Sequence, residues 1–235
     1  MFYMSKEVNN QAVSFDIWKT LIKSNPDYKP TRDEYIANTL DLETGIIKTA
    51  LRQADINCDE TSDKTGVQFG PVERLESMCV TLGIPLGRSA LSAIAHEVQE
   101  LFLQYPLRLM EPELLETLDN IQANRAIALT SNTGFIDGVY MREALRNIGI
   151  MDRTNHQIFS NEIGVAKPNA KIFARTAELL GVTPSSITHV GDNFAADYIG
   201  ATRAGMQAVY LTDENREDEV VATKTIKEAH DKGLL

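Results

Sequence analysis

The sequence has little cysteine and no long apolar run. Of its 235 residues only Cys58 and Cys79 are cysteines, and neither belongs to a metal-ligand spacing. Two buried free thiols in a reducing cytosol are therefore expected. No stretch approaches the ~20 apolar residues needed to span a bilayer, and the N-terminus lacks a long apolar region followed by small residues. The sequence predicts a soluble, cytoplasmic protein that has no membrane partner.

Positive charge is also scarce. The chain has 23 Lys and Arg residues against 33 Asp and Glu residues, which gives a net charge of −10 and a pI near 4.9. This net negative charge argues against binding to the phosphate backbone of nucleic acids. It does not forbid a locally positive pocket, because net charge describes the whole surface and not one site. The expected partner is a small phosphorylated molecule.

Short apolar segments alternate with helical patterns over much of the chain. The hydrophobic content of 43% allows a sizeable core. Near-continuous apolar runs occur at residues 12–15, 126–129, 187–190 and 207–211, as expected of strands that are covered on both faces. Helical spacing occurs at 111–124 and again from Pro168 to Leu180, where Gly181 follows. This alternation predicts a parallel α/β sheet.

The segment between the first two predicted strands is different. From about residue 31 to residue 105 the pattern is helical only, and three helices are predicted: one from after Thr31 through Leu51, one near 72–79 and one near 91–102. A crossover between two strands needs far fewer residues. Prolines at 26, 30 and 106 bound the insertion. We therefore expect a core domain formed by residues 1–24 and 107–235, and a helical cap domain formed by residues 25–106.

Four polar segments follow predicted strands or precede a helix. They centre on Asp16, on Ser131 and Asn132, on Lys167, and on Asp192 together with Asp197. Each alone has an ordinary explanation as a turn, a helix cap or a solvated lysine. Together they place a carboxylate, a hydroxyl, a lysine and further carboxylates at the edge where open α/β sheets bind ligands. Phosphoryl transfer needs this combination of nucleophile, oxygen-binding donors and metal-binding acids.

The order and spacing of these segments resembles the haloacid dehalogenase superfamily. The resemblance runs from Val13 to about Tyr210. Its most characteristic parts are Ala166-Lys167-Pro168 before a helix and Gly191-Asp192 followed by a second acid. The resemblance implies a Rossmann-like parallel sheet core flanked by helices, with an inserted all-α cap of type 1, as in subfamily I. The cap is expected to close over the site.

The same resemblance implies roles for individual residues. Asp16 would attack the substrate and form an aspartyl-phosphate. Ser131 and the backbone around Asn132 would bind the phosphoryl oxygens, and Lys167 would neutralise the charge of Asp16 and of the phosphoryl group. These expectations describe a Mg²⁺-dependent hydrolase.

A magnesium site is implied next to the nucleophile. Its expected ligands are Asp16, the backbone carbonyl of Trp18, Asp192 and Asp197. Asp197 could bind the metal directly or through water, or it could instead orient Lys167. Oxygen ligands suit Mg²⁺, and no cluster of histidine and cysteine competes for zinc.

Trp18 departs from the family pattern. Family phosphatases usually carry an aspartate two residues after the nucleophile, which protonates the leaving oxygen and then activates water. Tryptophan cannot transfer a proton, so an enzyme with Trp18 should hydrolyse esters slowly, since such assistance is typically worth ~10²–10⁴-fold. We expect the Trp18 side chain to line the substrate pocket. Lys19 replaces the usual small glycine and is expected to point to solvent.

Three alternatives follow from this departure. A haloacid dehalogenase also has a non-acidic residue at that position, but dehalogenases need no metal and typically lack the Gly191-Asp192 pair. A phosphonatase-like hydrolase would need a cap lysine for a Schiff base, for which Lys48 and Lys64 are the candidates. A catalytically degenerate binding module would not be expected to keep all four motifs. The oligomeric state, monomer or homodimer, is left open.

Four further residues are assigned supporting positions. His189 lies in the strand that leads to the last motif and is expected to be a hydrogen-bonded structural residue. Asn25, Tyr28 and Arg32 lie where the chain enters the cap, near the mouth of the site, where either substrate contact or hinge packing could explain them.

Overall fold

The computed structural model describes residues 12–214 and 220–235. Its larger sheet has six parallel strands in the order β5-β4-β1-β6-β7-β8. The strands are β1 (Ala12–Phe15), β4 (Ala126–Ser131), β5 (His156–Phe159), β6 (Ile187–Gly191), β7 (Gln207–Leu211) and β8 (Ala222–Thr223). All four predicted strands are present. The two edge strands β5 and β8 are not predicted, because short edge strands carry too few apolar residues for a recognisable pattern.

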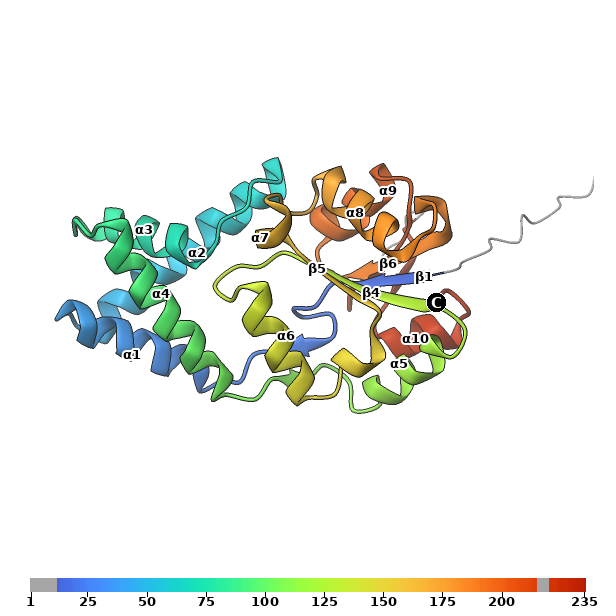
Figure 1. Cartoon of the computed structure of the whole chain (residues 1–235), viewed down its shortest axis with the longest axis horizontal. Helices are drawn as coiled ribbons and strands as arrows, with labels where there is room; N and C mark the ends of the chain where they lie inside the picture. Colours follow the sequence, from blue (N-terminus) through green and yellow to red (C-terminus); the bar gives the residue numbers. More distant parts are fainter. Residues whose placement is uncertain (1–11, 215–219) are drawn as a thin grey trace, which may run out of the picture.

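Helices cover both faces of this sheet (Figure 1). On one face lie α5 (Leu114–Gln122) and α10 (Ile226–Asp231), and on the other lie α8 (Ala170–Leu180) and α9 (Gly200–Arg203). The double cover explains why every residue of β1 is buried and apolar or small. Helix α8 begins two residues after Pro168, because the Asn169 side chain accepts a hydrogen bond from the Lys171 backbone N–H at 3.0 Å and caps the helix.

The remaining short elements connect these layers. Helix α6 (Gly138–Asn147) lies between the sheet and the inserted helices, in contact with β5 and α4. Single turns are formed by α7 (Ser160–Ile163), by the 3₁₀ turns η1 (Met151–Arg153) and η2 (Pro184–Ser186), and by the π-helical turn η3 (Phe194–Ile199). Among the described helices, none has both the length and the apolarity needed to cross a bilayer.

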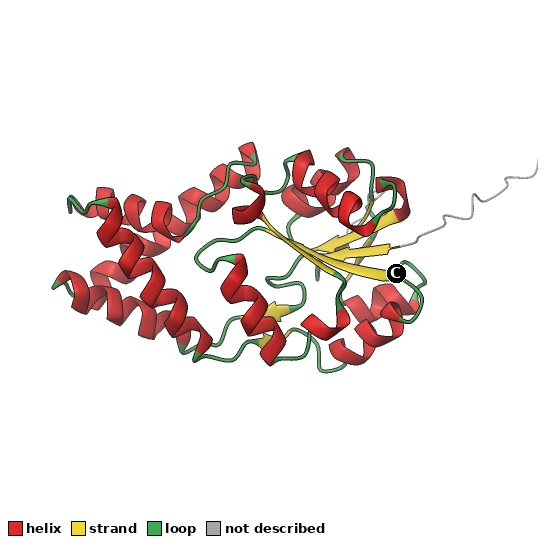
Figure 2. Ribbon diagram, in the orientation of Figure 1, coloured by secondary structure: helices red, strands yellow, loops and turns green. Residues whose placement is uncertain are grey.

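Four helices form the insertion, which is the helical cap (Figures 1 and 2). They are α1 (Tyr28–Leu40), α2 (Thr44–Thr65), α3 (Pro71–Leu82) and α4 (Arg88–Leu103). The prediction of three helices is wrong, because the first one is broken at Asp41, which has a left-handed φ of 54° and ends α1. The predicted start after Thr31 is also wrong: α1 begins at Tyr28, since a proline at position 30 costs no hydrogen bond in a first turn.

A two-stranded antiparallel ribbon joins the core to the cap. It pairs β2 (Ile22–Lys23) with β3 (Arg108–Leu109), so the chain leaves and returns at the same place. The division of the chain into two domains at residues 24/25 and 106/107 stays a prediction. Cys58 and Cys79 lie in the cap, and both are buried free thiols, as predicted.

Candidate active site

The carboxyl ends of three neighbouring strands carry the predicted polar residues. Phe15 at the end of β1 is in register with Leu129 of β4 and with Val190 of β6. The next residues along these strands therefore emerge together at one edge of the sheet. They include Asp16, Ser131 and Asp192, which the sequence places one or two residues after the paired positions. Parallel register, and not proximity in the chain, assembles the site.

Lys167 connects two of the acids. Its Nζ donates to Asp16 Oδ1 at 2.7 Å and to Asp197 Oδ1 at 2.6 Å, while Ser131 Oγ donates to the same Asp16 oxygen at 3.1 Å. Only 1% of Lys167 is exposed. Burial would lower the pKa of Lys167, but the two carboxylates outweigh it and raise this pKa, so the ammonium stays charged.

Asn132 holds the backbone of Lys167 at two points. Its Nδ2 donates to the Lys167 carbonyl at 3.0 Å, and its Oδ1 accepts from the Lys167 N–H at 2.6 Å. The side chain of Asn132 thus joins the loop after β4 to the loop before α8. This contact was not expected from the sequence, which assigns Asn132 a place beside the phosphoryl oxygens through its backbone.

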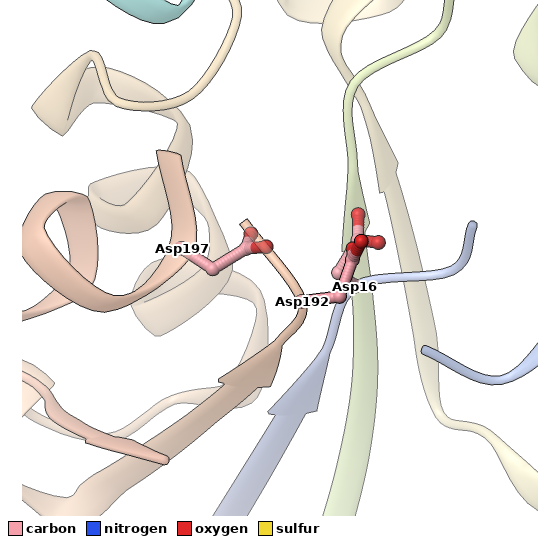
Figure 3. A group of neighbouring side chains, drawn as sticks. All are labelled: Asp16, Asp192 and Asp197. Atoms are coloured by element: carbon pink, nitrogen blue, oxygen red, sulfur yellow. The ribbon is translucent and has the colours of Figure 1, made fainter. Parts of the chain in front are cut away.

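Three carboxylates gather beside Lys167 (Figure 3). Asp16, Asp192 and Asp197 each offer an oxygen, and these oxygens lie within 4.8 Å of one another. Burial, together with the charges of Asp16 and Asp197, raises the pKa of Asp192 to about 7. Burial likewise raises the pKa of Asp16. Crowded acids with raised pKa values fit a divalent cation, because a bound cation would offset their mutual repulsion.

Asp197 is held by donors on both of its oxygens. Besides Lys167, its Oδ1 lies 3.2 Å from His189 Nε2, and its Oδ2 accepts from the Asn193 backbone N–H at 3.0 Å. Burial alone would raise the pKa of Asp197, but the Lys167 charge and the His189 contact hold it well below the usual range. Lys167 and the Asn193 N–H thus donate to opposite oxygens of Asp197, while an oxygen of this carboxylate also lies close enough to Asp16 and Asp192 to share a metal with them.

His189 is a buried hydrogen-bonded residue, as predicted. Its Nδ1 lies 3.0 Å from Ser14 Oγ, and its other ring nitrogen faces Asp197. Burial lowers the pKa of His189. The contact with Asp197 is not foreseen from the sequence, since only the fold brings the strand β6 and the turn η3 face to face.

A cavity of about 1060 Å³ lies above the carboxylates. Core residues Asp16, Lys167 and Asp192 line it on one side, and cap residues Arg32, Asp33 and Arg74 line it on the other. Trp18 also lines the cavity, as expected, and packs against Phe102 of α4 with ring centroids 6.2 Å apart. Lys19 is exposed at the rim, and its φ of 59° explains why a glycine would also fit there.

The residues predicted near the mouth have different positions. Tyr28 and Arg32 line the cavity, whereas Asn25 binds the Pro106 carbonyl at 3.3 Å beside the connecting ribbon. Lys48 borders the cavity but is exposed, and Lys64 pairs with Glu60 on the surface. Asp33 and Arg74 are not predicted, because the sequence does not show which faces of the cap helices turn toward the core.

The end of α2 contacts the core beside the site. Asn193 Nδ2 donates to Asp63 at 2.8 Å, the Ala166 N–H donates to the Gly66 carbonyl at 2.8 Å, and Gln68 Nε2 donates to the Thr133 carbonyl at 2.8 Å. We call residues 63–68 the docking segment. It contacts all three loops that carry Ser131, Lys167 and Asp192.

Comparison with known proteins identifies the family. Residues 11–205 match the haloacid dehalogenase-like hydrolases. The chain belongs to this family. The resemblance inferred from the motifs, the α/β core and the inserted helical cap are all confirmed. As a family member that keeps Asp16, Ser131, Lys167 and Asp192, the chain is a haloacid dehalogenase-like hydrolase.

Curated relatives match parts of the chain. A glyceraldehyde 3-phosphate phosphatase from Methanopyrus kandleri is 42% identical over 76 residues, which cover 32% of this chain and 33% of that protein. The pyrimidine 5′-nucleotidase YjjG from Escherichia coli is 31% identical over 123 residues, which cover 51% and 53% of the two chains. The matches thus span only about a third to a half of these relatives.

Solved structures share the fold over nearly the whole chain. The HAD hydrolase YfnB from Bacillus subtilis, bound to magnesium, has a TM-score of 0.72 at 12% identity, covering 97% of this chain and 100% of that one. A 2-haloacid dehalogenase from Pseudomonas syringae has a TM-score of 0.66 at 18% identity, covering 94% and 96%. The shared fold therefore does not distinguish phosphoryl transfer from dehalogenation.

Proposed function

We propose that this haloacid dehalogenase-like hydrolase is a Mg²⁺-dependent phosphatase or phosphotransferase that acts on a small phosphorylated metabolite through an aspartyl-phosphate at Asp16. The observation that carries the proposal is the position of the Asp16 carboxylate between Lys167, Ser131 and a second acid, Asp192. The names of the two relatives, a sugar-phosphate phosphatase and a nucleotidase, support it. The predicted cytoplasmic location and the absence of nucleic-acid partners remain part of the proposal.

The residues present fit a magnesium ion. Asp16 and Asp192 would hold it together with the Trp18 carbonyl, because oxygen ligands suit this cation. When bound, Mg²⁺ would supply charge neutralisation at the phosphoryl oxygens. Asp197 acts on Lys167 in this proposal, since the ion pair at 2.6 Å engages one of its oxygens and the Asn193 N–H engages the other.

The chain's own residues divide the work of the reaction. Lys167 and Ser131 both contact Oδ1 of Asp16, which leaves Oδ2 to attack phosphorus. A bond forms between Asp16 and phosphorus, the ester oxygen departs with its electron pair, and solvent supplies its proton. Water then attacks the phosphorus atom, which releases phosphate and restores Asp16. Trp18 offers no proton at either step, so substrates with stable leaving anions should react fastest.

The other candidate reactions fit the site less well. A haloacid dehalogenase needs no metal, and the cluster of Asp16, Asp192 and Asp197, which suits a divalent cation, would serve no purpose in it. A phosphonatase needs a desolvated cap lysine, whereas Lys48 is exposed. A non-catalytic module would have no use for a buried, doubly paired Lys167 beside a carboxylate that lines a large cavity.

The test is phosphate release from acetyl phosphate and p-nitrophenyl phosphate in the presence of MgCl₂. We expect Asp16→Asn to lower kcat by about 10³-fold or more, as removal of a nucleophile does. EDTA should abolish turnover and added MgCl₂ should restore it. The exposed Asp27→Asn serves as the matched control. Chloride release from 2-chloropropionate without metal, with no phosphate release, would contradict the proposal.

A further inference from the structure

An arginine and an aspartate form a rigid pair on the cap side of the cavity. Arg32 and Asp33 are adjacent in α1 and are only 5% and 4% exposed. Arg32 Nε and Nη2 donate to Asp33 Oδ1 at 2.9 and 2.8 Å. The guanidinium also lies over the Phe135 ring, 4.8 Å from its centroid. Two independent contacts therefore hold this guanidinium in one orientation.

Each member of the pair keeps one polar atom available. Within residues 12–214 and 220–235, no side chain or backbone group hydrogen-bonds to Arg32 Nη1 or to Asp33 Oδ2. Arg32 Nη1 lies 4.0 Å from Asp55 Oδ2, beyond hydrogen-bond range. Both residues line the cavity that contains Asp16. A fixed donor and a fixed acceptor thus stand side by side opposite the nucleophile.

The positive charges in this part of the cavity are already balanced. Asp33 offsets Arg32, while Arg74, also buried, binds Asp55 at 3.1 Å and Asp59 at 2.5 Å. A substrate with a negative charge on its leaving group, in addition to its phosphate, would therefore be repelled by Asp33 and Asp55 as well as attracted by the arginines. Lys167, at the floor of the cavity, is paired with Asp16 and Asp197. The other lysines that border the cavity, and Arg52, are exposed, so water and salt screen them.

We propose that Arg32 and Asp33 select a substrate whose leaving group is uncharged and presents a hydrogen-bond acceptor beside a donor. A vicinal diol and the amide edge of a heterocycle both have this chemistry. Arg32 Nη1 donates to the acceptor, and Asp33 Oδ2 accepts from the donor. The inference rests on the proposed phosphatase function, which brings the phosphoryl group to Asp16 and leaves the rest of the cavity, about 1060 Å³ in all, for the leaving group.

The test compares phosphate monoesters that differ by one carboxylate. Uridine 5′-monophosphate is paired with orotidine 5′-monophosphate, and glycerol 3-phosphate with 4-phosphoerythronate, which keeps the vicinal diol and adds one carboxylate. We expect kcat/KM to favour the uncharged member by about tenfold or more, since an added charge would lie near two buried carboxylates. Because uridine 5′-monophosphate carries a ribose diol as well as an amide edge, 2′-deoxyuridine 5′-monophosphate, which keeps the amide edge and has no vicinal diol, is measured beside it. An unchanged kcat/KM assigns recognition to the amide edge, and a fall of about tenfold or more assigns it to the diol.

Asp33→Asn tests the residue itself. Removing this carboxylate leaves the Arg32 charge unbalanced, so kcat/KM for the carboxylated member should rise relative to its uncharged partner, and the ratio should fall about tenfold. Structural damage would lower both members alike. Glu60→Gln, which removes one exposed negative charge from the same cap, is the control. If thermal unfolding shows that Asp33→Asn is not folded, Asp55→Asn takes its place.

Two outcomes separate this inference from the function on which it rests. Equal kcat/KM for both members of each pair, or an unchanged ratio in the folded variant, would overturn the selection by Arg32 and Asp33 while phosphatase activity stands. Absence of phosphate release from every ester, p-nitrophenyl phosphate included, would overturn the proposed function and the inference with it.

Discussion

Trp18 is the residue at which this chain differs most from the phosphatase pattern of its family. Its side chain is half-buried, lines the cavity and packs against Phe102 of α4. The Trp18 side chain therefore forms part of the apolar wall of the cavity, at a position where an aspartate would transfer a proton. An apolar ring also has no group that could activate a water molecule, which would slow hydrolysis of an aspartyl-phosphate and favour transfer to another acceptor.

Replacing this side chain tests the assignment. Trp18→Asp should raise kcat for glycerol 3-phosphate by about tenfold or more, part of the ~10²–10⁴-fold that acid–base assistance typically gives. Trp18→Asn opens the same space without a group that transfers protons, so it is the matched control. Steady-state kinetics with both variants measures the difference. Equal rates for the two, or a slower Asp variant with an intact fold, would argue against this account.

Among the elements, the turn after β6 has the closest packing at the site. The π-helical turn η3 begins after Asn193, whose Oδ1 accepts from the N–H groups of Ala195 and Ala196 at 3.0 Å each. This capping brings Asp197 back over the end of β6. A Cβ at Gly191 would lie 2.2 Å from Asp197 Cγ. The glycine is needed here for close approach, not for an unusual φ.

Gly191→Ala should therefore damage both stability and activity. The added methyl group must displace the Asp197 carboxylate, and overpacking of this kind typically costs about 1–3 kcal/mol. We expect a fall in Tm of several degrees, at about 2–4 °C per kcal/mol for a chain of this size, together with loss of most phosphatase activity. Gly45→Ala in α2, where a Cβ meets nothing within 4 Å, should leave activity unchanged and should not lower Tm, because alanine replaces glycine in a helix without strain. An unchanged Tm for Gly191→Ala would refute the packing argument.

At the scale of the whole molecule, the docking segment 63–68 holds the cap against the core. Gly66 ends α2 with a φ of 70°, and its carbonyl accepts the Ala166 N–H. A Cβ at this position would lie 2.7 Å from Asn169 Cβ, the residue that caps α8. The structure thus has no space for a side chain at position 66, where the end of α2 meets the loop before α8.

Alanine variants of two glycines distinguish the loss of this cap–core contact from the backbone strain of a left-handed alanine. Gly66 and Gly83 both end cap helices with a φ near 70°, but a Cβ at Gly83 meets nothing within 4 Å. Both alanine variants should lose the stability that a left-handed alanine costs, about 1–2 kcal/mol. Only Gly66→Ala should also raise KM and speed hydrogen exchange of residues 63–68. The same kinetic change in Gly83→Ala would show that docking is not the cause.

Local patterns in the sequence determine much of this protein. The buried strands are apolar runs, and each motif follows a strand or precedes a helix, so the sheet, the cap insertion and the set of Asp16, Ser131, Lys167, Asp192 and Asp197 could all be predicted. The break between α1 and α2 could not, because the apolar spacing of Leu40 and Ile47 continues across it.

Only the tertiary structure decides which cap residues face the nucleophile. The sequence places Arg32 near the mouth of the site, with substrate contact and hinge packing both left open, and does not single out Asp33; in the structure both are buried and line the cavity. The contacts of His189 with Ser14 and of Asp63 with Asn193 join residues 175 and 130 positions apart. The sequence by itself determined the chemistry at the sheet edge, since parallel strands bring their ends together whatever the loops contain. Substrate selection depends on which faces of the cap helices turn toward the cavity. No local sequence pattern decides this, because the orientation is set only when the cap packs on the core.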